Sequence, residues 1–268
     1  MSRSLDIVTH VYAAQLPQYA AMLRVQARSL VKHAPDNCDI KLVVACASPE
    51  HDEPTWTALR EIIGDRTMLT FAGGSDHVLY LSPQVSLHIA TMPRDQLFRR
   101  AIFRNKWMTK YSSADVVWLA DSDYSCGQGT IEAILAQVQK DSLLAFPAHY
   151  WIHNDHATGD RAWQDVLAGG SGVYPVDFKK IKAKVALGGM QILGGETAKR
   201  VGYLGNERKW QKPADASRPF ACFYDDSVWR RKNFPGGGTA IDIPNLFRMR
   251  HSVGSEGSPG PAGSVDGR

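Results

Sequence analysis

Two pairs of carboxylates have the spacing of groups that bind a cation or move a proton. Asp121 and Asp123 are separated only by Ser122 and come directly after an apolar run that ends at Ala120. Carboxylates this close repel one another unless a positive charge lies between them. Hard divalent cations take oxygen ligands and share their coordination with phosphate groups. The spacing therefore favours a metal site that would accept a diphosphate; the alternative is a polar turn that caps the next helix.

The second pair, Asp225 and Asp226, lies between aromatic residues and the basic pair Arg230-Arg231. Apolar surroundings raise the pKa of a carboxyl group towards values that suit a general base. We expect Asp226, or else Asp225, to take a proton from a reacting hydroxyl group. Both acids would also be favoured at the start of a helix by the helix dipole, without any role in catalysis.

The apolar run before Asp121, residues 116–120, has the length and β-branched content of a buried central strand. Its end is the usual place for a site on an α/β sheet. Upstream, strand and helix patterns alternate, which predicts an α/β fold with a mostly parallel sheet and helices on both faces. The predicted strands are 5–12, 40–45 and 67–71, and the predicted helices are 17–32 and 54–63.

A basic helix is predicted over residues 94–111, leading straight into the central strand. Arg104 and Lys106 are among its basic residues, and a basic face exposed to solvent is one interpretation of either of them. In residues 74–93, which precede the helix, the apolar residues show neither helical nor strand periodicity. We expect them to form a long connection over the edge of the sheet.

The second half of the chain contributes a loop and a glycine-rich segment. Residues 149–177 are rich in aromatic, His, Asp and Gly residues, which predicts a loop with aromatic walls. A metal site made of the histidines in this stretch is disfavoured, because Asn154, Asp155 and Gly159 indicate loop rather than helix. Within residues 186–203, two Gly-Gly pairs flank a short apolar strand, and glycine lets another group approach the backbone closely.

Composition, net charge and cysteine spacing limit the class of protein that this sequence can encode. The chain has 268 residues, 44% hydrophobic and 22% charged, with a net charge of +4 and a pI near 8.8. These values suit a globular protein with an anionic ligand. Four cysteines without Cys-X-X-Cys spacing argue against a zinc site or a disulfide framework. No signal peptide or membrane-spanning run is evident, so we expect a soluble cytoplasmic protein with no membrane partner.

The order of these features resembles that of nucleotide-sugar glycosyltransferases with the GT-A fold. The resemblance covers roughly residues 5–251 and implies a catalytic domain over 1–251, with a nucleotide-binding half of about 1–125 and an acceptor half of about 126–251. Residues 252–268, rich in Gly, Ser and Pro, are predicted to be a flexible tail. The enzyme would be an inverting one, distantly similar to the chitin and cellulose synthases but without their membrane segments.

The resemblance also implies roles for particular residues. Asp121, Asp123 and His251 would hold Mn²⁺ or Mg²⁺, and Arg104 or Lys106 would approach the phosphates. Gly188, Gly189 and Gln191 would line the sugar pocket. The alternative is that the glycines only mark the ends of the strand and the start of the next helix. Asp226 or Asp225 would act as the base; if neither does, a retaining mechanism becomes possible.

The donor would be a nucleoside-diphosphate sugar, with UDP as the expected nucleotide. The acceptor would be a hydroxyl group of a glycan, of a small molecule or of a modified nucleobase in DNA. Two other functions stay open from the sequence: a nucleotidyltransferase, and a sugar- or nucleic-acid-binding module without catalysis. The pattern does not indicate an oligomeric state.

Overall fold

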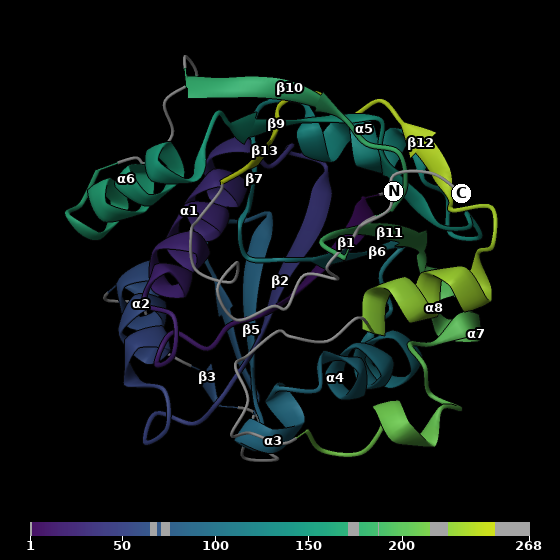
Figure 1. The fold of residues 1–268 in the computed structure, drawn as a ribbon, viewed down its shortest axis with the longest axis horizontal. Helices are drawn as coiled ribbons and strands as arrows, with labels where there is room; N and C mark the ends of the chain where they lie inside the picture. The colour runs from purple at the N-terminus through teal and green to yellow at the C-terminus, as the bar shows by residue number, and fades with distance from the viewer. Residues whose placement is uncertain are drawn as a thin grey trace.

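A nine-stranded mixed sheet runs through the molecule in the order β12-β8-β11-β6-β1-β2-β5-β4-β3 (Figure 1). The structure is a computed structural model that describes residues 2–64, 69–70, 76–170, 177–186, 188–214 and 225–249. The strands of this sheet are β1 (Arg3–His10), β2 (Cys38–Cys46), β3 (Leu69–Thr70), β4 (Asp76–Tyr80), β5 (Val85–Thr91), β6 (Val116–Ala120), β8 (Ala145–Pro147), β11 (Met190–Gly194) and β12 (Thr239–Ile241).

Only β11 and β4 run against the other strands of this described sheet. The centre, β6-β1-β2-β5, is parallel, and all five residues of β6 are buried. A strand covered on both faces needs such a continuous apolar run, which is why residues 116–120 could be recognised. The prediction of an α/β fold with a mostly parallel sheet is confirmed.

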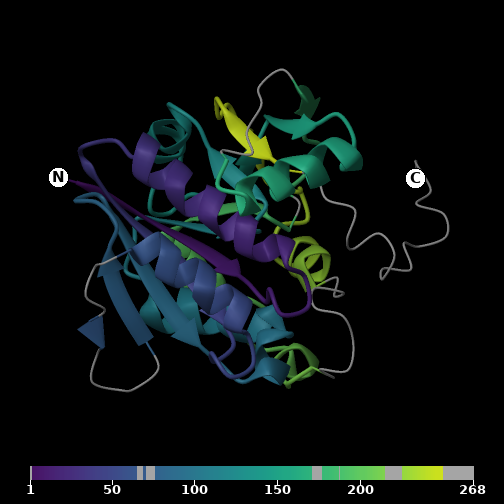
Figure 2. The same cartoon turned by 90° about the vertical axis from the view of Figure 1, so that its left-hand side faces the viewer.

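Helices cover both faces of the sheet, as Figures 1 and 2 show. α1 (Gln18–His33) and α2 (Glu53–Ile63) pack together on one face. α4 (Arg100–Lys106), the π-helical turn η1 (Trp107–Tyr111) and α7 (Gly195–Val201) lie on the other. The start of α2 is fixed locally, because the Asp52 side chain accepts a hydrogen bond from the Thr55 backbone amide and caps the first turn.

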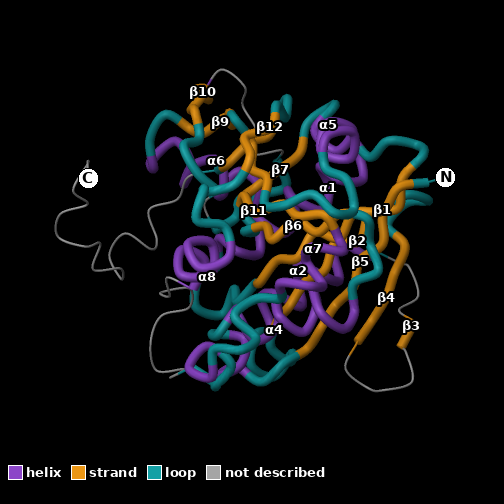
Figure 3. Tube along the Cα trace, turned by 90° about the vertical axis from the view of Figure 1, so that its right-hand side faces the viewer, coloured by secondary structure: helices purple, strands orange, loops and turns teal. Residues whose placement is uncertain are grey.

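A second, four-stranded sheet has the order β10-β9-β13-β7 and packs against α1 (Figures 1 and 3). Its strands are β7 (Tyr124–Cys126), β9 (His149–His153), β10 (Phe178–Lys182) and β13 (Leu246–Arg248). Together with α6 (His156–Leu167) and α1 it encloses a small apolar core around Trp163 and Phe178. Because β7 directly follows Asp123, this sheet fixes one side of the Asp121–Asp123 turn.

Three sequence-based predictions are corrected here. Residues 74–93 are not a connection: they contain β4 and β5, and β5 is a parallel neighbour of β2. Residues 149–177 are not a loop throughout, since they form β9 and α6. The predicted helix 94–111 is broken into α3 (Arg94–Leu97), α4 and η1, with an interruption at Phe98-Arg99.

The remaining helices are α5 (Thr130–Gln137), η3 (Arg208–Trp210) and α8 (Asp225–Asn233). α8 begins at the second acidic pair, as the sequence pattern indicates. In the described part of the chain, no helix is both long and apolar enough to cross a membrane.

Candidate active site

The Asp121-Ser122-Asp123 turn joins β6 of the large sheet to β7 of the small one. The backbone oxygen of Asp121 accepts a hydrogen bond from the Gln26 side-chain amide of α1, at 3.3 Å. The backbone oxygen of Asp123 accepts one from the Met249 backbone amide, at 2.9 Å, just after β13. The turn is therefore held from two sides by segments far apart in the sequence.

Arg100 connects the two acidic pairs. One guanidinium nitrogen lies 3.3 Å from Asp121 Oδ1, and the other lies 3.2 Å from Asp225 Oδ1. The Arg100 side chain is only 11% exposed, and that of Asp225 is 1% exposed. Charge-assisted contacts in such a poorly solvated place are strong and fix geometry. Arg100 thus holds the end of β6 and the start of α8 together.

Arg104 lies one helical turn after Arg100 and supports the same carboxylate. Its Nη2 is 3.5 Å from Asp121 Oδ1, and its Nη1 donates to the Tyr203 hydroxyl at 3.1 Å. Buried His10, at the end of β1, lies near both arginines; burial first, then the charges of Arg104 and Arg100, hold its pKa well below the usual range. His10 is therefore neutral at physiological pH and adds no further positive charge.

Asp123 has a cationic partner of its own. Its Oδ2 accepts a hydrogen bond at 2.9 Å from Arg248, whose guanidinium also lies over the Tyr124 ring. The other carboxylate oxygen, Oδ1, is buried and has no hydrogen-bond partner. An unpartnered buried carboxylate oxygen is costly, so it marks a position where a cation or donor would be favourable.

Gly188 and Gly189 pass directly beside the acidic groups. A Cβ atom on Gly189 would lie 2.8 Å from Asp121 Oδ2, and one on Gly188 would lie 2.7 Å from Asp226 Oδ2. Both positions thus have room for hydrogen only. The Gly189 backbone oxygen accepts from the Trp118 indole at 3.0 Å, which ties the glycines to β6. Gln191 donates weakly to the Asp226 backbone oxygen, at 3.4 Å.

The two acids of the second pair have different surroundings. Asp225 is buried and engaged by Arg100, whereas Asp226 is half-buried and faces Gly188. Burial raises the pKa of the Asp226 carboxyl group; Arg100 lowers it, and Asp225 and Asp121 raise it. Of the two, Asp226 is the more exposed acid and the one without a direct contact to Arg100 among the described ion pairs.

The structure brings together Asp121, Asp225, Asp226, Arg104, Gly188, Gly189 and Gln191, with Asp123 in the same turn as Asp121. Lys106 lies elsewhere: two residues after Arg104, it is roughly 200° further round the helix, where it is exposed and lines a separate pocket. His251 lies outside the described residues. Arg100, which sequence reasoning missed, had one signal: its four-residue spacing from Arg104 puts both on one helical face.

The oxygen donors fit a divalent cation in part. Asp121 is 32% exposed on its side chain, and Asp123 offers its unpartnered oxygen. Both are hard ligands of the kind that Mg²⁺ and Mn²⁺ prefer. Over the described ranges, no group of three or more His, Cys, Asp or Glu side chains is arranged to hold a metal ion, and this includes the histidines of residues 149–156.

No protein-family model matches this sequence. No curated protein matches it either. Solved structures similar to the chain include mouse xyloside xylosyltransferase 1 in its apo form, with 12% identity, a TM-score of 0.42 and coverage of 90% of this chain and 85% of the other. An active-site mutant of LgtC has 17% identity, a TM-score of 0.45 and coverage of 88% and 72%. The galactosyltransferase LgtC in complex with donor and acceptor sugar analogues has 16% identity and a TM-score of 0.38, with coverage of 88% of this chain and 67% of the other. All three are glycosyltransferases.

Proposed function

We propose that this protein is a metal-dependent glycosyltransferase, which moves a sugar from a nucleoside-diphosphate sugar to an acceptor hydroxyl group. The observation that carries the proposal is the Arg100 bridge between Asp121 and Asp225. It puts a pair of candidate metal ligands, a candidate base and a glycine-lined wall at one place. Each feature alone has a structural explanation, but their convergence through a nearly buried arginine suits a reaction site.

Asp121 and Asp123 would hold the cation, supported by the exposed face of Asp121 and the unpartnered oxygen of Asp123. His251 would be a third ligand. The support for it is that Met249, two residues earlier, is hydrogen-bonded to the Asp123 backbone. A bound Mg²⁺ or Mn²⁺ would offset the negative charge that develops on the departing diphosphate.

The arginines would add to this charge compensation. Arg100 and Arg104 both lie within 3.5 Å of Asp121, so positive charge is already fixed where a diphosphate would enter. Preorganised charges of this kind need no rearrangement when the reaction occurs. Gly188 and Gly189 would let the donor sugar lie against the backbone between Asp121 and Asp226, and Gln191 would support that wall.

Asp226 would remove the proton from the acceptor hydroxyl group. The acceptor oxygen then forms a bond to the anomeric carbon, while the bond from that carbon to the diphosphate oxygen breaks and its electron pair leaves with the nucleoside diphosphate. The proton ends on Asp226. Direct displacement by this route inverts the anomeric configuration. Asp225, bound to Arg100, would position α8 rather than exchange protons.

The proposed donor is a UDP-sugar and the proposed acceptor is a glycan or small-molecule hydroxyl group. A nucleotidyltransferase is a weaker candidate, because its glycine-rich phosphate loop would follow the first strand. In this protein the backbone amides after β1 are already used: Ala13 donates to Thr55 Oγ1 and Ala14 donates to Asp52 Oδ1.

A screen of nucleoside-diphosphate sugars tests the proposal. The purified protein is incubated with each donor and Mn²⁺ or Mg²⁺, with and without a chelator. We expect release of nucleoside diphosphate, and stabilisation against thermal unfolding, for a subset of donors and only with metal. Absence of both signals across the set would contradict a donor-using enzyme. Stabilisation without turnover, with every candidate acceptor including DNA, would favour a binding module.

Whether transfer inverts or retains the anomeric configuration is measured separately. NMR of the first-formed product gives the configuration at the anomeric carbon. Inversion is expected if Asp226 acts as the base. Retention would leave sugar transfer intact as the function but would remove Asp226 from the role of base in a direct displacement.

A further inference from the structure

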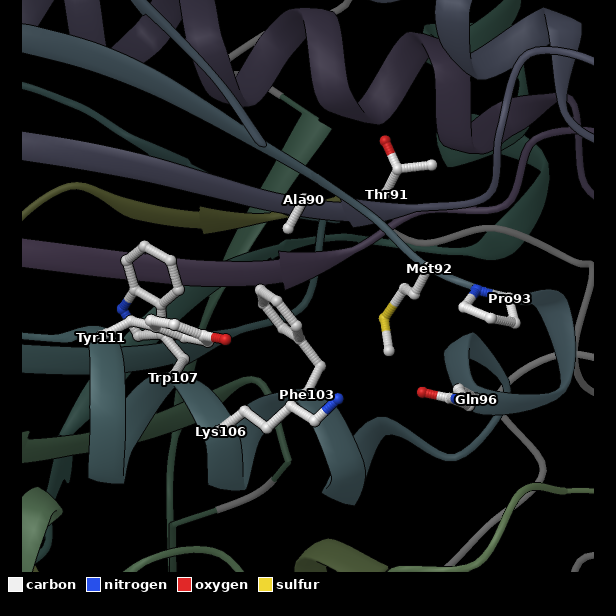
Figure 4. Close-up of a pocket in the computed structure, with 9 residues that line it drawn as sticks. All are labelled: Ala90, Thr91, Met92, Pro93, Gln96, Phe103, Lys106, Trp107 and Tyr111. Carbon is white, nitrogen blue, oxygen red and sulfur yellow. The ribbon is translucent and has the colours of Figure 1, made fainter. Parts of the chain in front are cut away.

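A small pocket lies on the sheet face that carries α4, apart from the carboxylates and the glycine pair (Figure 4). It is formed where the end of β5 meets α3, α4 and η1, and its volume is about 140 Å³. A cavity of about 150 Å³ accommodates one six-membered ring. The pocket is therefore the size of a single ring rather than of a nucleotide.

Aromatic side chains from one stretch of helix form its wall. Phe103 and Trp107 have ring centroids 5.9 Å apart, and Trp107 and Tyr111 follow at 6.0 Å. The indole nitrogen of Trp107 donates to Asp6 Oδ2 at 2.8 Å, so its polar edge is satisfied by the core. Tyr111 is 56% exposed. Tyr111 therefore places an exposed aromatic ring at the edge of this wall.

Polar groups surround the same space. Figure 4 shows the Lys106 amine and the Gln96 amide pointing toward one another beside Met92 and Phe103, whereas the Thr91 hydroxyl points away from them. Among the described residues, no ion pair or hydrogen bond engages the side chains of Lys106 or Gln96. A wall of aromatic faces with a few unengaged hydrogen-bonding groups is the usual make-up of a small-ligand site.

The open surface continues beyond the pocket. Val78, Tyr80 and His88 lie on the same face of the β4–β5 pair as Ala90, which lines the pocket. Tyr80 is 66% exposed, and His88 makes an edge contact with Trp107.

From these observations we infer that the pocket binds one acidic monosaccharide unit, such as a hexuronic acid. The ring would lie against the aromatic wall, its hydroxyl groups would bond the Gln96 amide, and its carboxylate would pair with the Lys106 amine. The site is separate from the proposed donor site. It goes beyond the proposed reaction, and its test requires neither metal nor nucleotide.

The test is direct binding of methyl β-glucuronide to the full chain, by calorimetry and saturation-transfer NMR. Methyl β-glucoside and benzoate are the comparison ligands. We expect the glucuronide to bind about fivefold more tightly than the glucoside, which is what one exposed charge pair contributes. Benzoate should bind more weakly, because it has no hydroxyl group to bond Gln96. Tighter binding of benzoate would overturn the assignment to sugars.

Two pairs of variants localise the binding. Lys106→Gln should remove the preference for the glucuronide, whereas Lys110→Gln, an exposed lysine in η1 that does not line the pocket, should keep it. Tyr111→Ala should weaken both sugars, whereas Tyr80→Ala should leave the single-ring ligands unaffected. All four positions are exposed, so the fold should persist. Equal glucuronide affinity in Lys106→Gln and wild type, or no binding at millimolar concentration, would overturn the inference.

Discussion

At the scale of single residues, the candidate site depends on which basic side chain reaches the carboxylates. The sequence indicated the acidic pairs, the glycines and Arg104, all of which meet in the structure. It did not indicate Arg100, and it offered Lys106 instead. All three basic residues follow the interruption at Phe98-Arg99 and lie in α4. Their spacing therefore held the signal: four residues put Arg100 on the same face as Arg104, whereas two residues put Lys106 on another.

Replacing Arg100 should affect both activity and stability. In Arg100→Met, Asp225 stays buried without its cation, so the free energy of unfolding should fall by about 3 kcal/mol. Sugar transfer should fall by roughly two orders of magnitude or more, since a preorganised charge is lost. Chemical denaturation and initial rates measure the two effects, with Lys110→Met as the control on the same stretch of helix. Wild-type stability and rate in Arg100→Met would refute the bridging role.

The pH dependence of transfer follows from the raised pKa of Asp226. A base works only when deprotonated, so activity should be lost as pH falls through a pKa above the ordinary carboxyl value. Arg100 lowers this pKa, so Arg100→Met should move the acid limb to higher pH, whereas Arg100→Lys should move it less. The measurement is the pH profile of kcat/KM. An acid limb unchanged by Arg100→Met would show that another group titrates.

At the scale of elements, the errors of prediction share a cause. β5 was missed because the face that it shares with Val78 and Tyr80 of β4 carries Ser86, His88 and Ala90, which interrupt the apolar run expected of a buried strand. β9 and α6 were missed because aromatic and His residues there pack in the second sheet and its small core, not in a loop. Tertiary packing, which sequence patterns do not reveal, decided both segments. The strand before Asp121 was predictable because both its faces are apolar.

The two neighbouring glycines should separate the two acidic sites. Gly189→Ala would force Asp121 and the Tyr124 ring to shift, since the added Cβ would come within 2.8 Å and 2.6 Å of them. We expect it to lose metal-dependent stabilisation by the donor. Gly188→Ala would instead crowd Asp226 Oδ2, so it should retain that stabilisation but transfer sugar slowly. Thermal shift with and without Mn²⁺, alongside rate, distinguishes them.

Gly236→Ala is the control for this pair, because nothing lies within 4 Å of the position that its Cβ would take. It should behave as wild type in both measurements. If Gly188→Ala and Gly189→Ala failed in the same way, the glycines would serve only to pack β11 beside β6.

At the scale of the whole molecule, the small sheet and the large sheet meet at the Asp121–Asp123 turn. α1 and β13 hold the turn from outside, and Arg100 ties it to α8. The site is thus assembled from segments spread along the chain, which explains why residue order alone could suggest it but could not show its contacts. The division into halves near residue 125 and the flexible tail stay predictions.

The partly buried His88 should make the fold sensitive to acid. Burial, followed by the charge of Lys41, lowers the pKa of His88 to about 4. Between that value and the ordinary one near 6.5, the unfolded chain binds a proton that the folded chain does not, so stability should fall as pH falls through this window. Because His88 is partly exposed, its share should be on the order of 1 kcal/mol after allowance for solvent screening.

Denaturation at pH 7 and pH 4.5 measures this effect in wild type, His88→Gln and the exposed control His51→Gln. The difference in stability between the two pH values should shrink in His88→Gln and stay unchanged in His51→Gln. An equal difference in all three proteins would show that His88 does not contribute.

The most direct test of the proposed function compares donor affinity with transfer rate in Asp121→Asn and Asp226→Asn. Calorimetry with Mn²⁺ gives donor affinity, and initial rates give transfer. Asp121→Asn should lose both, because it would hold the metal and the donor diphosphate. Asp226→Asn should bind the donor nearly as wild type while transfer falls by about two to four orders of magnitude, the usual contribution of a positioned base. Near wild-type transfer by Asp226→Asn, or metal-dependent donor binding that survives in Asp121→Asn, would contradict the account.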